Sequence, residues 1–154
     1  MKIRKFKKED ARRVSYFIHK NIREVLSKYQ PKKVSDFFYK NMSPAGIIRK
    51  SKNTDYYLVV AKDRILGING LRDNEIRTMF VNPRYHGKGV GKKLIDNIEK
   101  VAKKRKIRKL KVHSTPYAEK FYKKYGFKRI KKVTQKAREN KNIKWLEILM
   151  EKKI

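Results

Sequence analysis

The hydrophobic residues of this chain recur at two spacings that alternate along its length. Over 11–28 they return every three to four positions, which predicts an amphipathic helix with Asp10 as its N-cap. The apolar stripe of this helix consists of Ala11, Val14, Ile18, Ile22 and Val25. A second, less regular helical region covers 32–51 and is interrupted near "SPAG".

Runs rich in β-branched and aromatic residues predict strands around these helices. The chain opens with "MKIRKF", and "DYYLVVAKDRILGINGL" contains two runs separated by the polar "KDR", as in a hairpin. The remaining strands are "NEIRTMFV", "RKLKVHS", "FKRIKKVTQK" and "IKWLEILMEKK". The last is apolar on both faces, which favours an interior position in a sheet.

Two further helices are predicted in the second half of the chain. One begins after a glycine-rich loop and carries an apolar stripe over 94–102. The other has Thr115 as N-cap and Pro116 at its first position, and it ends before Gly126. The order β-α-α-β-β-β-α-β-α-β-β predicts a mixed α/β sheet with helices on both faces. The length fits one domain, 1–154.

The charge of the chain is extreme, with 45 Lys and Arg against 14 Asp and Glu, a net +31. Such a field attracts polyanions and so allows non-specific binding of nucleic acid through a basic face. The alternative is a source organism whose proteins are rich in Lys throughout. Charge bears on association rather than on fold, so composition leaves both interpretations open.

Several classes of protein are excluded by composition. The chain has no cysteine, and its three histidines match no metal-ligand spacing, so we expect neither disulfides nor a metal. No apolar run approaches the roughly 18 residues of a membrane span. The N-terminal "MKIRKFKKED" lacks the apolar core of a signal peptide. We therefore expect a cytoplasmic protein without a membrane partner.

The stretch "TMFVNPRYHGKGVGKKLI" (78–95) joins a strand to a helix through three glycines at alternate positions. Glycine lets backbone N–H groups converge on a phosphate beside the positive end of the helix. The Walker A pattern fails here, because Gly87 and Gly91 are separated by three residues and Lys92 is followed by Lys93. The dinucleotide fingerprint G-x-G-x-x-G fails as well, because the spacing is G-x-G-x-G.

The same loop resembles the acetyl-CoA loop of the GNAT superfamily of N-acetyltransferases, V-x-P-x-x-[Q/R]-G-x-G-[I/V/A]-[G/A]-x-x-L. The matching residues are Val81, Pro83, Gly87, Gly89, Val90, Gly91 and Leu94. His86 departs from the pattern, because it stands where the family usually has Gln or Arg.

A second stretch, "AEKFYKKYGF", matches the family's A-x-x-F-Y-x-K-x-G-F at every specified position. Its matching residues are Ala118, Phe121, Tyr122, Lys124, Gly126 and Phe127. Thr115 occupies the place where the family often has Asn. The resemblance implies a mostly antiparallel sheet of six to seven strands with about four helices, in which two central strands splay apart to admit the cofactor.

The resemblance also implies acetyl-CoA as co-substrate, a primary amine as acceptor and direct attack of the amine on the thioester. Tyr122 would be the general acid and Glu75, or water, the base, with His113 as an alternative base. The implied cofactor-binding residues are Met79, Phe80, Val81, His86, Gly87, Lys88, Gly89, Val90, Gly91, Lys92, Thr115 and Ala118.

Acceptor specificity in this family comes largely from the first helical region and the last hairpin, both basic here. That charge favours an amine attached to an anionic group over polyamines, and the acceptor is a small molecule or a protein amine. Two alternatives remain open: a basic nucleic-acid-binding protein, and a family member that binds acetyl-CoA without catalysis. We expect a monomer or a homodimer.

Overall fold

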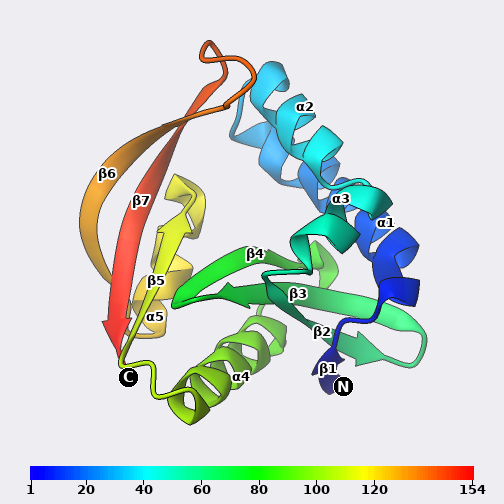
Figure 1. Cartoon of the computed structure of the whole chain (residues 1–154), viewed down its shortest axis with the longest axis vertical. Helices are drawn as coiled ribbons and strands as arrows, with labels where there is room; N and C mark the ends of the chain where they lie inside the picture. Colours follow the sequence, from blue (N-terminus) through cyan, green and yellow to red (C-terminus); the bar gives the residue numbers. More distant parts are fainter.

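The fold is built on one seven-stranded sheet, seen in a computed structural model that describes all 154 residues (Figure 1). The strands lie in the order β1-β2-β3-β4-β5-β7-β6, and every neighbouring pair is antiparallel except β4 and β5. Their bounds are β1 Lys2–Lys5, β2 Asp55–Ala61, β3 Arg64–Arg72, β4 Glu75–Val81, β5 Lys109–Ser114, β6 Lys128–Lys136 and β7 Lys144–Lys153. The predicted mixed, mostly antiparallel sheet is therefore confirmed.

Five α-helices cover the two faces of the sheet. Their bounds are α1 Ala11–Glu24, α2 Lys32–Asn41, α3 Pro44–Lys50, α4 Val90–Lys104 and α5 Glu119–Lys124. Helices α1, α2 and α3 lie on one side, and α4 and α5 lie on the other (Figure 1). The upper ends of β6 and β7 lean toward α2 in this view.

The core is divided by the sheet into two main clusters. On the α1 side, residues such as Ile18 and Ile22 pack against Leu58 of β2 and Ile68 of β3. On the α4 side, a cluster of eleven buried residues takes members from β3, β4, α4, β5, α5 and β7. This second cluster crosses from β4 to β5, so side chains bridge the two halves of the sheet where backbone pairing is short.

The element order predicted from periodicity is confirmed, with differences at two places. The first helix ends at Glu24 and continues as a short 3₁₀ turn over Leu26–Lys28. The second helical region divides into α2 and α3, with Ser43 capping α3 by accepting a hydrogen bond from the Gly46 N–H. Strand β7 lies between β5 and β6, which confirms its predicted interior position.

Asp10 occupies the N-cap position of α1, but its carboxylate does not cap that helix. It accepts two hydrogen bonds from the Arg4 guanidinium, both at 2.9 Å, and one from the Lys7 N–H at 2.8 Å. A buried carboxylate is stabilised more by two hydrogen bonds from a charged guanidinium than by one from a neutral backbone N–H. The pairing with Arg4 therefore replaces the predicted helix cap.

Candidate active site

Strands β4 and β5 are parallel but pair over two positions alone, Glu75 with Lys111 and Ile76 with Val112. Beyond these pairs the strands diverge, as the wide angle between them in Figure 1 shows. The divergence coincides with a bulge in β4, where the register with β3 shifts between Ile68 and Gly70. Thr78 sits in this bulge with φ +52°, in the left-handed region that a β-branched residue rarely adopts.

The edge of β4 that faces β5 has no strand partner after the bulge. The Asn82 N–H donates to Leu66 of β3, and bonded and non-bonded pairs alternate along an antiparallel ladder. Phe80, paired with Ile68, therefore has its backbone groups directed to β3. The backbone groups of Met79 and Val81 are directed away from β3, into the notch between β4 and β5.

The glycine-rich loop lies at the end of the same strand and leads into α4. Gly87 and Gly89 have φ +74° and +86°, so glycine is required there by backbone conformation. The Lys93 N–H donates to Gly89 and the Lys88 N–H to Tyr85. No acceptor in the chain takes the backbone N–H groups of Gly87, Gly89, Val90, Gly91 and Lys92. These groups form a cradle for an anion at the start of a fifteen-residue helix.

Gly91 is needed for a different reason, which is space. A Cβ at this position would lie 2.6 Å from Cε2 of Phe121, the aromatic residue of the second motif. The close approach places the first turn of α4 directly against α5. The two motifs, separated in the sequence, therefore meet in the structure at this contact.

The polar side chains of the loop are engaged locally. The His86 Nε2 lies 3.2 Å from the Val81 carbonyl oxygen and donates to it when that nitrogen carries the proton. Lys88 stands 5.4 Å over the ring of Tyr85, and Lys92 pairs with Asp96 at 2.5 Å. Both lysines are exposed and contribute positive charge near the cradle.

Tyr122 lies on α5 within the cluster that crosses the splay, with 4% of its surface exposed. Burial, with a smaller effect from Tyr117, raises the pKa of Tyr122, so the phenol stays protonated at neutral pH. Ala118 packs against the same cluster. Thr115 stands at the N-cap of a short 3₁₀ turn over Pro116–Ala118 without a side-chain capping bond.

On the opposite face of the sheet, Glu75 begins a line of ionisable side chains from three neighbouring strands. The His113 Nε2 is 3.4 Å from one Glu75 oxygen, and its Nδ1 is 3.6 Å from the Glu147 carboxylate. Glu75 also pairs with Arg77 at 2.7 Å. Glu147 was not among the residues singled out from the sequence. Burial raises its pKa, and weaker effects from Trp145 and His113 oppose that rise.

The sequence matches the family described as "Acetyltransferase (GNAT) domain" over residues 25–152, most of the chain. The chain belongs to the GNAT acetyltransferase family. Its predicted membership and its identification as an enzyme that transfers acetyl groups are confirmed. No curated protein matches the sequence.

Solved GNAT structures share the fold at low sequence identity. A GCN5-related N-acetyltransferase from Rhodopseudomonas palustris superposes with TM-score 0.89 at 20% identity, covering 99% of this chain and 95% of the other. PaiA N-acetyltransferase from Thermoplasma acidophilum in complex with coenzyme A gives 0.78 at 20%, with 99% and 98% covered. Ribosomal-protein-S5-alanine acetyltransferase from Vibrio fischeri gives 0.67 at 19%, with 98% and 91% covered.

In this GNAT chain the structure brings together the two motifs and both edges of the notch. It places Tyr122 on the α5 side of the sheet and Glu75 on the α1 side, at the point where β4 and β5 part. Sequence reasoning missed Thr78 and Glu147. No local pattern marks Thr78, because its conformation arises from the mismatch between β3 and β4. Glu147 is marked only by its place next to the buried Ile148 in an otherwise apolar stretch.

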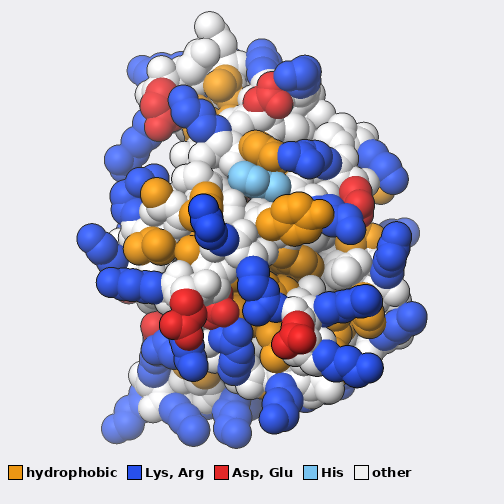
Figure 2. All heavy atoms as spheres, turned by 90° about the vertical axis from the view of Figure 1, so that its right-hand side faces the viewer, with side chains coloured by type: hydrophobic (Ala, Val, Ile, Leu, Met, Phe, Trp, Pro, Cys, Tyr) orange, Lys and Arg blue, Asp and Glu red, His pale blue; other side chains and the backbone are white.

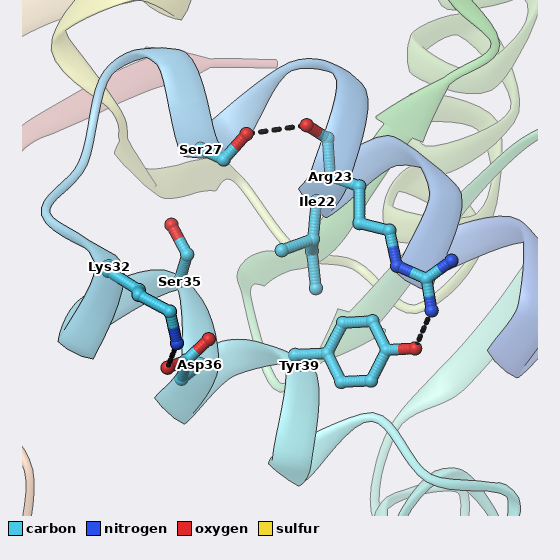
Figure 3. A pocket seen from close by; sticks show the side chains of 7 residues that line it. All are labelled: Ile22, Arg23, Ser27, Lys32, Ser35, Asp36 and Tyr39. Atoms are coloured by element: carbon cyan, nitrogen blue, oxygen red, sulfur yellow. Dashed lines mark hydrogen bonds and ion pairs between the residues drawn. The ribbon is translucent and has the colours of Figure 1, made fainter.

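A hollow of about 340 Å³ opens between α1 and α2, away from the residues predicted for catalysis and cofactor binding (Figure 3). Its polar side chains are largely paired with one another: Arg23 donates to the Tyr39 hydroxyl, and Lys32 pairs with Asp36. None of the residues predicted for catalysis or cofactor binding lines this hollow.

The fold contains neither a cluster of metal-ligating side chains nor a membrane-spanning helix. No group of three or more His, Asp or Glu side chains is arranged to hold a metal ion. No helix combines the length and the apolar character needed to cross a bilayer.

Proposed function

We propose that this enzyme moves an acetyl group from acetyl-CoA to a primary amine inside the notch between β4 and β5. The observation that carries the proposal is the two-residue pairing of these strands, which leaves backbone groups of β4 unpaired beside an anion cradle. PaiA N-acetyltransferase from Thermoplasma acidophilum, which has a similar fold, was solved in complex with coenzyme A, and this supports coenzyme A as a ligand of the present chain.

The cofactor arm would pair with β4 as an added strand does. Backbone groups of Met79 and Val81 face the notch, while those of Phe80 are bonded to β3. The pyrophosphate would be held by the N–H groups of the loop from Gly87 to Lys92, with Lys88 and Lys92 adding positive charge. Thr115 and Ala118 lie at the start of the α5 segment and would border the arm, and His86 would contact the pyrophosphate after leaving Val81.

The chemistry needs a neutral amine, a polarised carbonyl and a proton for the departing thiolate. The amine nitrogen attacks the thioester carbon, the new C–N bond forms, and the C–S bond breaks. Glu75 accepts the proton that the amine loses, directly or through water, and His113 is the alternative acceptor. Tyr122 gives its phenol proton to the thiolate and regains one from solvent.

Thermal unfolding with acetyl-CoA, coenzyme A and heparin at about 50 mM and about 200 mM salt tests the proposal. We expect acetyl-CoA to raise Tm at both salt concentrations, because the backbone groups of the notch bind it specifically. We expect stabilisation by heparin to fade at the higher salt, because it depends on released counterions. A polyphosphate of equal charge is measured alongside. If acetyl-CoA stabilises the protein no more than this polyphosphate does, the assignment of the notch to acetyl transfer fails and the nucleic-acid-binding alternative is favoured. If acetyl-CoA binds and no amine is acetylated, the chain binds the cofactor without catalysis.

A further inference from the structure

Glu147 is set apart from the other acidic side chains of this basic protein by its lack of a Lys or Arg partner. Every other acidic residue that is at least partly shielded from solvent pairs with a lysine or arginine; these are Asp10, Asp55, Glu75, Glu99, Glu119 and Glu151. The other carboxylates without any partner are exposed ones, such as Glu139. The chain has a net charge of +31, so a shielded carboxylate that none of its lysines or arginines pairs with is available to bind a cation from a ligand.

The surroundings of Glu147 keep it accessible yet poorly solvated. Its side chain is 16% exposed, and its nearest ionisable neighbour is His113, with Nδ1 at 3.6 Å. Arg77 of β4 also acts on the carboxylate, but its guanidinium is bonded to Glu75. Gln135 of β6 is a neutral neighbour. Poor solvation strengthens the attraction for a cation that replaces water there.

An aromatic wall stands beside this carboxylate, two residues along β7. The ring of Trp145 lies 5.5 Å from that of Phe37 and 4.9 Å from that of Phe38, both on α2. The His113 Nδ1 is a buried atom without a hydrogen-bond partner, and the Trp145 side chain is near enough to Glu147 to act on its carboxylate. Aromatic faces attract alkylammonium groups and pack against alkyl chains.

We propose that Glu147 and the wall of Phe37, Phe38 and Trp145 form an acceptor subsite that selects an amine carrying a second positive charge, an aliphatic diamine or polyamine. This inference rests on the proposed function. The amine to be acetylated lies toward Glu75 and His113, and the second ammonium group pairs with Glu147. Because the two carboxylates lie on either side of the His113 ring, a short alkyl chain joins the two groups.

This subsite reverses the acceptor preference expected from net charge. Surface lysines repel a cationic acceptor by long-range electrostatic repulsion, which salt screens and weakens. A charge-assisted hydrogen bond to a shielded carboxylate acts at short range and is less sensitive to salt. Local chemistry therefore decides the acceptor, and the overall charge affects chiefly the rate of encounter.

The subsite contains the sole tryptophan of the chain, so its intrinsic fluorescence reports occupancy directly. We would titrate the acetyl-CoA-free protein with 1,4-diaminobutane and with 1-aminobutane, in wild type, Glu147→Gln and Glu139→Gln. Glu139 is an exposed acid of the same hairpin without an ion-pair partner, so its variant matches the change in net charge. We expect Glu147→Gln to weaken diamine binding about 10- to 100-fold, with 1-aminobutane little affected and Glu139→Gln without effect.

Equal affinity of wild type for the two amines, or a diamine affinity unchanged in Glu147→Gln, overturns the inference. An equal loss in Glu139→Gln also overturns it, because the effect would then come from net charge. Glu147→Asp keeps the carboxylate and should retain the preference for the diamine, which covers the case in which the Gln variant does not fold. Acetyl transfer to each amine is measured separately. Equal transfer to both amines overturns this inference alone, whereas Glu147-dependent diamine binding without transfer overturns the proposed function alone.

Discussion

Tyr122 combines a packing role in the core with a proposed chemical role, and one substitution separates them. Its ring packs edge-on against Phe121 and Phe127, while its hydroxyl is the proposed proton donor. We expect Tyr122→Phe to lower kcat about 100-fold, because the thiolate loses its acid, and to change the free energy of unfolding by less than about 0.5 kcal/mol. Steady-state kinetics and urea unfolding measure the two effects. Tyr125→Phe, on the adjoining turn, is the control, and full turnover in Tyr122→Phe would remove Tyr122 as the acid.

Gly89 and Gly91 test two different reasons for glycine in one loop. Gly91→Ala brings a Cβ within 2.6 Å of Phe121, so we expect a loss of about 1 to 2 kcal/mol in unfolding free energy. Gly89→Ala meets no atom within 4 Å but keeps φ +86°, so we expect about 1 kcal/mol from backbone strain. Phe121→Leu should rescue part of the first loss and none of the second. Urea unfolding of the single and double variants measures these changes in unfolding free energy. If the effects of Gly91→Ala and Phe121→Leu simply add in the double variant, the steric explanation is contradicted.

At the scale of elements, the Arg4–Asp10 pair ties β1 to the start of α1 and makes stability depend on pH. The bond to Arg4 lowers the pKa of Asp10 below its ordinary value, burial opposes this, and the Lys7 N–H assists. A lowered folded pKa means that the stabilisation is complete above the unfolded value of about 3.9 and is lost as pH falls through the folded value.

We therefore expect Asp10→Asn to cost about 1 to 2 kcal/mol at pH 7, discounted because the Arg4 side chain is 35% exposed. The difference between wild type and variant should shrink below about pH 4, since protonation removes the same interaction. Urea unfolding from pH 7 to pH 2.5 measures it. Glu9→Gln, an exposed neighbour without an ion-pair partner, should leave the curve unchanged. A difference that stays constant with pH would show that the carboxylate charge is not the cause.

At the scale of the whole molecule, the divergence of β4 from β5 separates β1 to β4 from β5 to β7, and these two parts unfold either together or independently. We propose that 1–154 folds as one domain, because the buried cluster on the α4 side joins Leu71 and Ile76 to Leu110 and Ile148 across the seam. We expect the fluorescence of Trp145 on β7 and the far-UV circular dichroism of the whole chain to show the same unfolding midpoint. Separate midpoints would indicate that β5, β6 and β7 unfold independently of β1 to β4.

Net charge also belongs to the scale of the whole molecule. The face shown in Figure 2 carries Lys and Arg over its whole extent, with apolar side chains between them and few acidic ones. A charge spread in this way steers anions toward the protein generally and marks no single site. For this reason composition was a poor guide to function, and Glu147, which has no Lys or Arg partner, is more informative than the many lysines.

The sequence by itself determined the helices, the strands, the glycine loop and the second motif, because each depends on periodicity or spacing between near neighbours. It was also sufficient for the family, since seven positions of the loop and six of the second motif match. The tertiary structure alone decided the bulge at Thr78, the direction of the Met79 and Val81 backbone groups, and the line from Glu75 through His113 to Glu147. These features arise where strands distant in the sequence pair or separate, and no local pattern records which residues will face one another there.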